Sequence, residues 1–341
     1  MTLPTDRRIR EIGRTVSKAV VDRLGQGFGK PLVVAVSGGA DSSALLHLLA
    51  DTRSRHGWRI RAAHVDHAIQ SSAVRARFRE TARRLATIAD VPLDIREADA
   101  RAEAERTQDG LEAAARRVRY EALARLARER GAQAVAVAHT LDDQAETVLL
   151  HILRGSGLDG LSGMAPLRPL GDGLQLVRPM LEVTRTETEA VCRAYEWTPA
   201  EDPSNLDPVH TRNRIRMSLL PLMRELNPNV AERLAGLAGS VAGDRELLEM
   251  LGAQALAQLR DEHGAIARRS FLSLPGQLQV RVIRAFCRER GVTLSAERTA
   301  AALQVVQHGH GVVELPEGRR LSVAGGTIAL DPGSPPAGSA S

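Results

Sequence analysis

The chain has 341 residues, 43% of them hydrophobic, which is enough for about two domains or for one large α/β domain with an appendage. No apolar run approaches the roughly 20 residues of a membrane span, and the charged start MTLPTDRRIREIG lacks a signal-peptide core, so a cytoplasmic location without membrane partners is expected. The formal net charge is +5, and almost all of the positive charges are arginines. The two cysteines form no C-x-x-C motif, and this absence argues against a structural zinc or an iron–sulfur cluster.

After a helix predicted at 5–25, an apolar, β-branched strand is predicted at 32–36. The turn SGGADS at 37–42 follows it directly and leads into a helix. Glycines let the backbone turn sharply and expose its N–H groups, the helix start adds partial positive charge, and Ser42 or Ser43 can cap the helix. The stretch therefore predicts an anion site, although an ordinary strand-to-helix turn has the same features.

This turn lacks both usual nucleotide motifs, because no Lys follows it as in a P-loop and it holds no G-x-G-x-x-G. Asp41 would repel a phosphate unless a divalent cation lies between them. The pattern S-G-G-x-D-S at the end of a first strand is instead similar to that of the PP-loop (N-type) ATP pyrophosphatases. The resemblance implies cleavage of ATP between its α- and β-phosphates, in most members through an adenylated substrate.

A second strand is predicted at 58–65 and ends in HVDH, residues 64–67. These polar residues follow the carboxyl end of a strand, where open parallel sheets place ligands. A metal site is one interpretation, although alternation along the strand puts His64 and Asp66 on one face and His67 on the other. A loop that shapes the nucleotide pocket is the favoured interpretation.

The next elements are a basic helix at 71–89, a short strand at 92–96 and a polar loop at 97–108. DGLEAAARRVRY then opens a helix that runs from 109 to about 130. Glu112 and Arg116 share a face of this helix, with Arg119 three residues later. A solvated, salt-bridged face is the simplest interpretation of that pattern.

A further buried strand at 134–138 runs into HTLDDQAET, residues 139–147. Asp143 and Glu146 lie about one turn apart on the same face of the predicted helix. The helix dipole favours acidic residues in a first turn, but Asp142 or Asp143 alone would satisfy it. Three carboxylates beside an ATP site suggest Mg²⁺ ligation or capture of a cationic substrate.

A Gly/Ser-rich loop at 154–164, a strand at 174–177 and a helix at 184–195 come next. From residue 211 the chain reads TRNRIR, which puts Arg212, Arg214 and Arg216 at the start of a helix. The helix dipole disfavours cations there, so the cluster needs an anionic partner. RNA phosphate and nearby carboxylates both remain open.

The C-terminal part is rich in Leu, Ala and Arg, with helices predicted at 229–262, 277–290 and 294–306 and a small hairpin from 312–315 and 320–330. We expect an α/β adenylation domain at 1–225, built on a Rossmann-like parallel sheet with helices on both faces. A mainly helical domain at 226–330 and a disordered tail at 331–341 follow.

The motifs SGGADS, HVDH, EAAARRVRY, AHTLDDQAET and LRGSGLDGLSGM occur in that order, with EDPSN and TRNRIR downstream. The ordered set resembles the tRNA(Ile)-lysidine synthase family over residues 31–222, and more loosely over 270–330. The resemblance implies a ligase that uses ATP to adenylate the C2 oxygen of the wobble cytidine, position 34, of a minor isoleucine tRNA with a CAU anticodon. The ε-amine of L-lysine then displaces AMP.

The resemblance also implies roles for single residues. ATP would be bound by Ser37, Gly38, Gly39, Ala40, Asp41, Ser42, His64 and Arg116. Catalysis would rest on Asp41, Arg116, Asp143 and Glu146. L-lysine would be bound by Asp143, Glu146 and Asp142, and Mg²⁺ by Asp41 and Asp143. The tRNA would contact Arg212, Arg214 and Arg216, and a homodimer is left open.

Alternative functions remain. A PP-loop tRNA thiolase generally needs catalytic cysteines or a cluster, a pattern that the widely separated Cys192 and Cys287 do not match. An ammonia-dependent synthetase would not need the basic cluster at 212–216. A non-catalytic tRNA-binding relative would gain nothing from acidic residues beside a phosphate loop.

Overall fold

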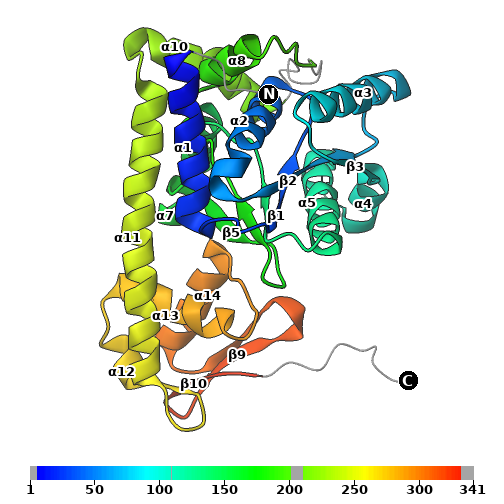
Figure 1. Ribbon diagram of the computed structural model, residues 1–341. Helices are drawn as coiled ribbons and strands as arrows, with labels where there is room; N and C mark the ends of the chain where they lie inside the picture. The colour runs from blue at the N-terminus through cyan, green and yellow to red at the C-terminus, as the bar shows by residue number, and fades with distance from the viewer. Residues whose placement is uncertain (1–5, 109, 201–209, 332–341) are drawn as a thin grey trace, which may run out of the picture. The chain divides into compact units, whose positions relative to one another are not determined.

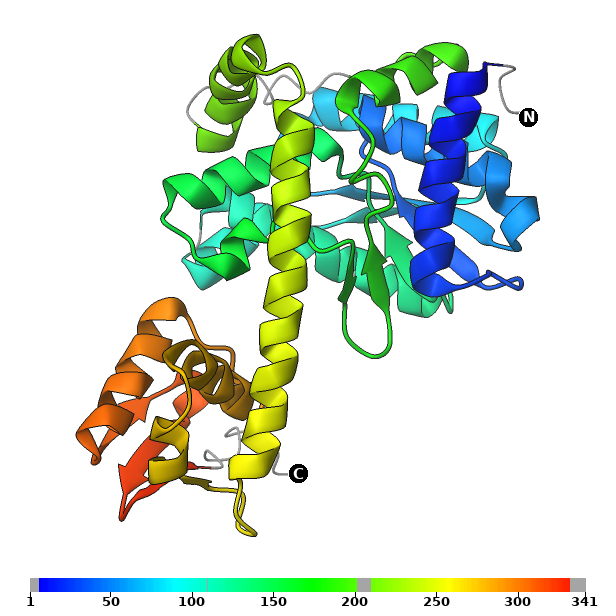
Figure 2. The same ribbon diagram turned by 90° about the vertical axis from the view of Figure 1, so that its left-hand side faces the viewer.

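The computed structural model describes residues 6–108, 110–200 and 210–331 (Figure 1). EDPSN at 201–205 and most of the predicted tail lie outside these residues. The chain forms two compact units, Met1–Gly239 and Ser240–Ser341. The division falls inside helix α11 (Val230–Leu259), a single long helix in Figure 2. A domain boundary near residue 225 stays a prediction.

In the part of the chain that is described, the first unit contains a six-stranded sheet with the order β3-β2-β1-β4-β6-β5. The pairings of β1 with β2 and β4 are parallel, and only the edge pair β5–β6 is antiparallel. The strand order reverses between β1 and β4, which makes their carboxyl ends the switch point where such sheets bind ligands. The strands are β1 (Pro31–Ala35), β2 (Arg59–Asp66), β3 (Leu93–Glu97), β4 (Ala134–Ala136), β5 (Leu167–Pro169) and β6 (Gln175–Val177).

Alternation along β1 supplies both faces of this sheet with apolar side chains. Leu32 and Val34 point into the larger core, and Val33 points into the core on the opposite face. The first face is covered by α1 (Arg7–Leu24), α2 (Ala40–His56), α3 (Ser72–Ile88) and α8 (Arg185–Ala194), and the second by α5 (Leu111–Glu129), which packs with α4 (Ala100–Thr107). The predicted Rossmann-like sheet with helices on both faces is confirmed (Figure 1).

Some local predictions were wrong. The predicted loop at 97–108 contains α4, because Asp99 caps it by accepting from the N–H groups of Arg101 and Ala102. The Gly/Ser-rich loop contains the short helix α7 (Leu158–Leu161). Strand β5 was missed because three residues ending in Pro169 are too short to show a periodic pattern.

A smaller core attaches the arginine-rich segment to helix α6 (Leu141–Leu153). Val148 of α6 packs with Ile215, Leu220 and Val230. The segment consists of α9 (Thr211–Arg214), the π-helical turn η2 (Ile215–Leu219) and α10 (Leu220–Leu226). This packing lays the TRNRIR sequence against the acidic start of α6.

The second unit has its own core around the fully buried Phe271 and Phe286. The predicted hairpin is part of an antiparallel sheet with the order β7-β10-β9-β8, and in Figure 2 its strands lie beside the unit's helices. Gly325 and Gly326, with φ of +58° and +79°, make the turn that divides 320–330 into two strands. The elements after α11 are β7 (Ile266–Ala267), α12 (Arg268–Leu272), α13 (Gly276–Arg288), α14 (Ala296–His308), β8 (Gly311–Glu314), η3 (Pro316–Gly318), β9 (Arg320–Ala324) and β10 (Thr327–Leu330).

None of the described helices is both long and apolar enough to pass through a lipid bilayer.

Candidate active site

The SGGADS turn after β1 is held by its own hydrogen bonds. The Ser37 N–H donates to the Ser42 hydroxyl at 3.1 Å, and that hydroxyl lies 3.1 Å from the carbonyl of Gly39. Gly38 has φ of +96°, and a Cβ at this position would approach the Phe78 ring at 3.0 Å. The turn therefore needs glycine at position 38, both for its backbone conformation and for space.

The helix that follows the turn has no side-chain cap among the described residues. Its N-cap is Gly39, so the prediction that Ser42 or Ser43 caps it was wrong. Ser42 instead bonds back into the turn, and Ser43 is fully buried. The first N–H groups of α2 are left available together with the positive end of the helix dipole, which is the arrangement that binds phosphate.

A cavity of about 340 Å³ lies at this turn, at the carboxyl ends of β1, β2 and β4. Its wall includes Ser37, Gly39, Asp41, Ser42 and His64, all predicted to bind ATP. The cavity thus occupies the switch point of the sheet, where a nucleotide would be expected.

His64 and Asp66 of the HVDH motif both have protein partners. His64 Nδ1 lies 2.8 Å from the carbonyl oxygen of Val36, and burial lowers its pKa. Asp66 is bound by the guanidinium of Arg75 at 2.7 Å, with that of Arg79 at 3.6 Å. Within the described residues no group of three or more His, Cys, Asp or Glu side chains could hold a metal ion. His64, Asp66 and His67 line the cavity, and the favoured interpretation of the motif as a loop that shapes a nucleotide pocket stays a prediction.

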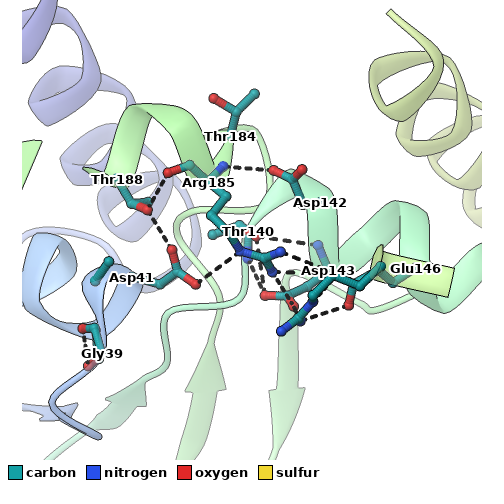
Figure 3. Close-up of polar contacts among 12 residues, drawn as sticks. Gly39, Asp41, Thr140, Asp142, Asp143, Glu146, Thr184, Arg185 and Thr188 are labelled. Atoms are coloured by element: carbon teal, nitrogen blue, oxygen red, sulfur yellow. Dashed lines mark hydrogen bonds and ion pairs between the residues drawn. The ribbon is translucent and has the colours of Figure 1, made fainter. Parts of the chain in front are cut away.

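Helix α6 begins with a capping box that fixes Asp143. Thr140 accepts from the backbone N–H of Asp143, while one carboxylate oxygen of Asp143 accepts from the N–H of Thr140 at 3.0 Å. The other oxygen, Oδ1, points away from the cap toward a group of arginines (Figure 3). Glu146, one turn later, is completely buried.

Arginines from three other elements, α9, η2 and α8, bind this acidic pair. Arg216 Nε lies 2.7 Å from Glu146, and Arg212 Nε lies 2.9 Å from it. Both guanidinium groups also reach Asp143 Oδ1 at 3.2 Å. Arg185, from α8, approaches Asp143 at 3.4 Å and Glu146 at 3.5 Å. Arg212 and Arg216 were predicted to contact tRNA, and in the structure their partners are the nearby carboxylates that the sequence also left open.

Asp41 is linked to the same cluster through α8. Its carboxylate accepts from the Thr188 hydroxyl at 2.5 Å and lies 3.9 Å from Arg185 Nε (Figure 3). Burial raises the pKa of Asp41 to about 6, although Thr188 and Arg185 favour the charged form. Asp41 and Asp143 thus lie on either side of the Arg185 guanidinium, which they share.

Asp142 is committed to structural contacts. It accepts from the backbone N–H of Arg185 at 2.7 Å and from the guanidinium of Arg224. Burial opposes its ionisation, but these two donors outweigh burial and lower its pKa. Asp142 therefore joins α6 to α8 and α10, and its predicted role in binding lysine stays a prediction.

The structure places Arg119, and not Arg116, in the wall of the cavity. Burial lowers the pKa of Arg119. Arg116 is exposed, with its guanidinium 5.2 Å from the centre of the Tyr120 ring. Its predicted contact with ATP stays a prediction.

The chain is similar to known proteins over most of its length. The sequence profile of the PP-loop domain family matches residues 11–223. The tRNA(Ile)-lysidine synthase of Salinispora tropica is 37% identical over 340 residues, which cover 96% of this chain and 97% of the relative. That of Thermosynechococcus vestitus is 36% identical, over 91% of this chain and 88% of the relative. The chain belongs to the tRNA(Ile)-lysidine synthase family.

Membership in the tRNA(Ile)-lysidine synthase family makes the chain an enzyme of the ATP-using PP-loop class. A solved structure, the U34-tRNA thiolase of Methanococcus maripaludis with its [4Fe-4S] cluster, superposes with a TM-score of 0.58 at 16% identity. The match covers 69% of this chain and 80% of the thiolase, and it shows the shared fold alone. Cys192 and Cys287 are both buried, and burial raises their pKa values to about 12 and about 11, so neither favours the thiolase alternative.

Two residues of this candidate site were missed from the sequence, Arg185 and Thr188. They belong to α8, which lies more than 140 residues from Asp41 along the chain. The one local signal was the capping box of Thr184 and Glu187, which fixes where α8 begins. This capping box predicts where α8 starts. It carries no information on which face of α8 lies against the SGGADS turn.

Proposed function

We propose that the chain ligates L-lysine to C2 of the wobble cytidine, position 34, of a minor isoleucine tRNA with a CAU anticodon. The C2 oxygen attacks the α-phosphorus of ATP, the bond to the β-phosphate oxygen breaks, and pyrophosphate leaves. The ε-amine nitrogen of lysine then bonds to C2 and releases a proton, and AMP leaves with the former C2 oxygen. Family membership over 96% of the chain supports this reaction class.

The observation that carries the proposal is the acidic pair beside the PP-loop cavity. Asp143 and Glu146 already hold planar cations at 2.7 to 3.5 Å, although Glu146 is completely buried. A site that stabilises guanidinium groups has the charge and the hydrogen-bond acceptors to stabilise the ammonium groups of lysine. We assign Asp143 and Glu146 to lysine on this basis.

ATP fits the turn after β1. The available N–H groups at the start of α2, together with Ser37 and Ser42, form an anion site that opens into the cavity. Arg119 adds a cation in the cavity wall, and Arg116 lies one helical turn away on α5. These groups can neutralise phosphates in place of the P-loop lysine that the sequence lacks.

The donor set also fits Mg²⁺. Asp41 and Asp143 offer hard carboxylate oxygens on either side of Arg185, and proteins usually hold Mg²⁺ through one or two carboxylates and the phosphates of a substrate. When bound, the ion would neutralise charge on the triphosphate. Mg²⁺, the homodimer and the cytoplasmic location stay predictions.

Of the three arginines predicted to contact tRNA, Arg214 is the one exposed to solvent, and it has no carboxylate partner among the described residues. Arg212 and Arg216 neutralise the acidic pair instead. We therefore propose Arg214 as the member of this cluster that contacts RNA phosphate.

The test incubates the purified protein with transcribed minor isoleucine tRNA, ATP, Mg²⁺ and radiolabelled L-lysine. Label that stays in the tRNA after mild alkali is expected, because a bond to the base survives conditions that cleave a 3′-terminal ester. A tRNA with uridine in place of the wobble cytidine is the matched control and should stay unlabelled.

The partial reactions identify which half of the proposal fails. Pyrophosphate release that depends on tRNA, without incorporation of lysine, would keep adenylation and contradict lysine as the nucleophile. Binding of tRNA without any pyrophosphate release would support the non-catalytic alternative.

A further inference from the structure

Three arginines surround one aromatic ring at the edge of the cavity. The guanidinium carbons of Arg168, Arg116 and Arg119 lie 4.9, 5.2 and 5.6 Å from the centre of the Tyr120 ring. None of the three has a carboxylate partner within the described residues, in contrast to the arginines that bind Asp143 and Glu146. The ring face attracts the cations, but it cannot neutralise three positive charges. The cluster therefore calls for an external anion.

Arg116 and Arg168 line a groove between α5 and β5, with an open volume of about 730 Å³. Arg125, which is exposed, and Arg128, which pairs with Asp172, extend the basic wall along α5, and Glu121 is the acidic residue in it. At 1.5 Å per residue, the basic wall from Arg116 to Arg128 extends about 18 Å along the helix axis, which is long enough for several steps of a stacked nucleic acid strand.

The groove adjoins the PP-loop cavity through a shared wall. Tyr120 lines both, with Arg119 on the cavity side and Arg116 on the groove side. A nucleotide whose base reacts on the Tyr120 side of the cavity would place its flanking phosphates in the adjoining groove.

We propose that the groove between α5 and β5 binds the sugar–phosphate backbone of the tRNA strand next to the reacting nucleotide. The inference rests on the proposed function and extends it to a surface outside the TRNRIR cluster. Because Arg116, Arg125 and Arg168 lie together in this groove, it supplies an electrostatic contact with RNA in addition to Arg214.

The test replaces two groove arginines that have no proposed role in chemistry, in the double variant Arg125→Ala/Arg168→Ala. Its affinity for tRNA is measured by anisotropy across a series of KCl concentrations. Binding should be roughly tenfold weaker near physiological salt, and the log–log salt slope should fall by about 1.5 to 2 for two lost phosphate contacts.

The matched control is Arg55→Ala/Arg193→Ala, which removes two exposed arginines at the ends of α2 and α8. It should keep the wild-type salt slope, and ATP affinity should be unchanged in both variants. A groove variant with the wild-type slope would overturn the inference, and so would one that loses ATP affinity and keeps its tRNA affinity. If either of these results is obtained and the wild-type enzyme still labels tRNA with lysine, the proposed function stands and only the groove assignment fails.

Discussion

Gly38 and Asp41 lie in one short turn, but they are constrained for different reasons. Gly38 is fixed by geometry, since its positive φ and its distance to Phe78 leave no room for a side chain. Asp41 is fixed by charge, because its half-buried carboxylate depends on Thr188 and Arg185 for stabilisation. The contacts with Phe78, Thr188 and Arg185 come from residues far away in the sequence, so the motif alone could not reveal them.

Replacing Asp41 with Asn should change the pH dependence of stability. The raised pKa of about 6 means that the folded state binds more protons than the unfolded state between pH 4 and 6, so stability falls as the pH rises through that window. The difference between this pKa and the ordinary pKa of Asp corresponds to roughly 3 kcal/mol in the free energy of unfolding. D41N should therefore be more stable than the wild type by up to that amount at pH 8 and by little at pH 4.

Urea unfolding at the two pH values measures this difference. Asp22→Asn is the control, because Asp22 pairs with Lys18 on the surface and such pairs contribute little at any pH. An equal effect of D41N at pH 4 and pH 8 would contradict the assigned origin of the raised pKa.

Replacing Gly38 with Ala should weaken ATP binding at least tenfold. The new Cβ needs a φ that L residues rarely adopt and meets the Phe78 ring, so the turn would open and move its N–H groups. Isothermal titration with ATP measures the change. Gly110→Ala, at a glycine with open space around its Cβ position, should leave ATP binding unaffected.

At the scale of elements, the site forms where α6 meets the α9–η2 segment. Apolar contacts of Val148 with Ile215 and Leu220 fix that meeting, and they bring Arg212 and Arg216 to the acidic pair. The sequence predicted α6, its two carboxylates on one face and the arginine cluster. The sequence could not show whether the arginine cluster binds carboxylates or RNA, because its ion pairs with Glu146 join residues 66 and 70 positions apart.

Replacing Arg216 with Met should destabilise the first unit by roughly 2 kcal/mol. Breaking a buried pair usually costs about 3 to 5 kcal/mol, but Arg185 and Arg212 would still face Glu146. Arg214→Met, on the same segment but exposed, should have little effect on stability. Equal destabilisation by the two variants in urea would show that loss of the ion pair is not the cause.

At the scale of the whole molecule, the two compact units have separate cores, although α11 runs through their division. The sequence predicted the parallel sheet well, because buried strands such as β1 are continuous apolar runs. It predicted the second unit less well, because strands of two to five residues divided by glycines carry little periodic signal.

Replacing Phe286 with Ala should destabilise the second unit selectively, by about 3 to 5 kcal/mol. Both tryptophans, Trp58 and Trp197, lie in the first unit, so their fluorescence reports that unit alone, whereas circular dichroism reports both. The variant should lower the dichroism midpoint and leave the fluorescence midpoint unchanged. A parallel shift of both midpoints would mean that the two units unfold together.

The proposed lysine site is tested most directly by the Michaelis constants of Glu146→Gln, with Glu189→Gln as an exposed control on α8. Loss of a charge-assisted contact of about 1.5 to 3 kcal/mol predicts a KM for L-lysine that is roughly 10- to 150-fold higher. The KM for ATP and the pyrophosphate release that depends on tRNA should stay near wild-type values. A folded Glu146→Gln enzyme with an unchanged KM for lysine would contradict the assignment of the acidic pair to the amine substrate.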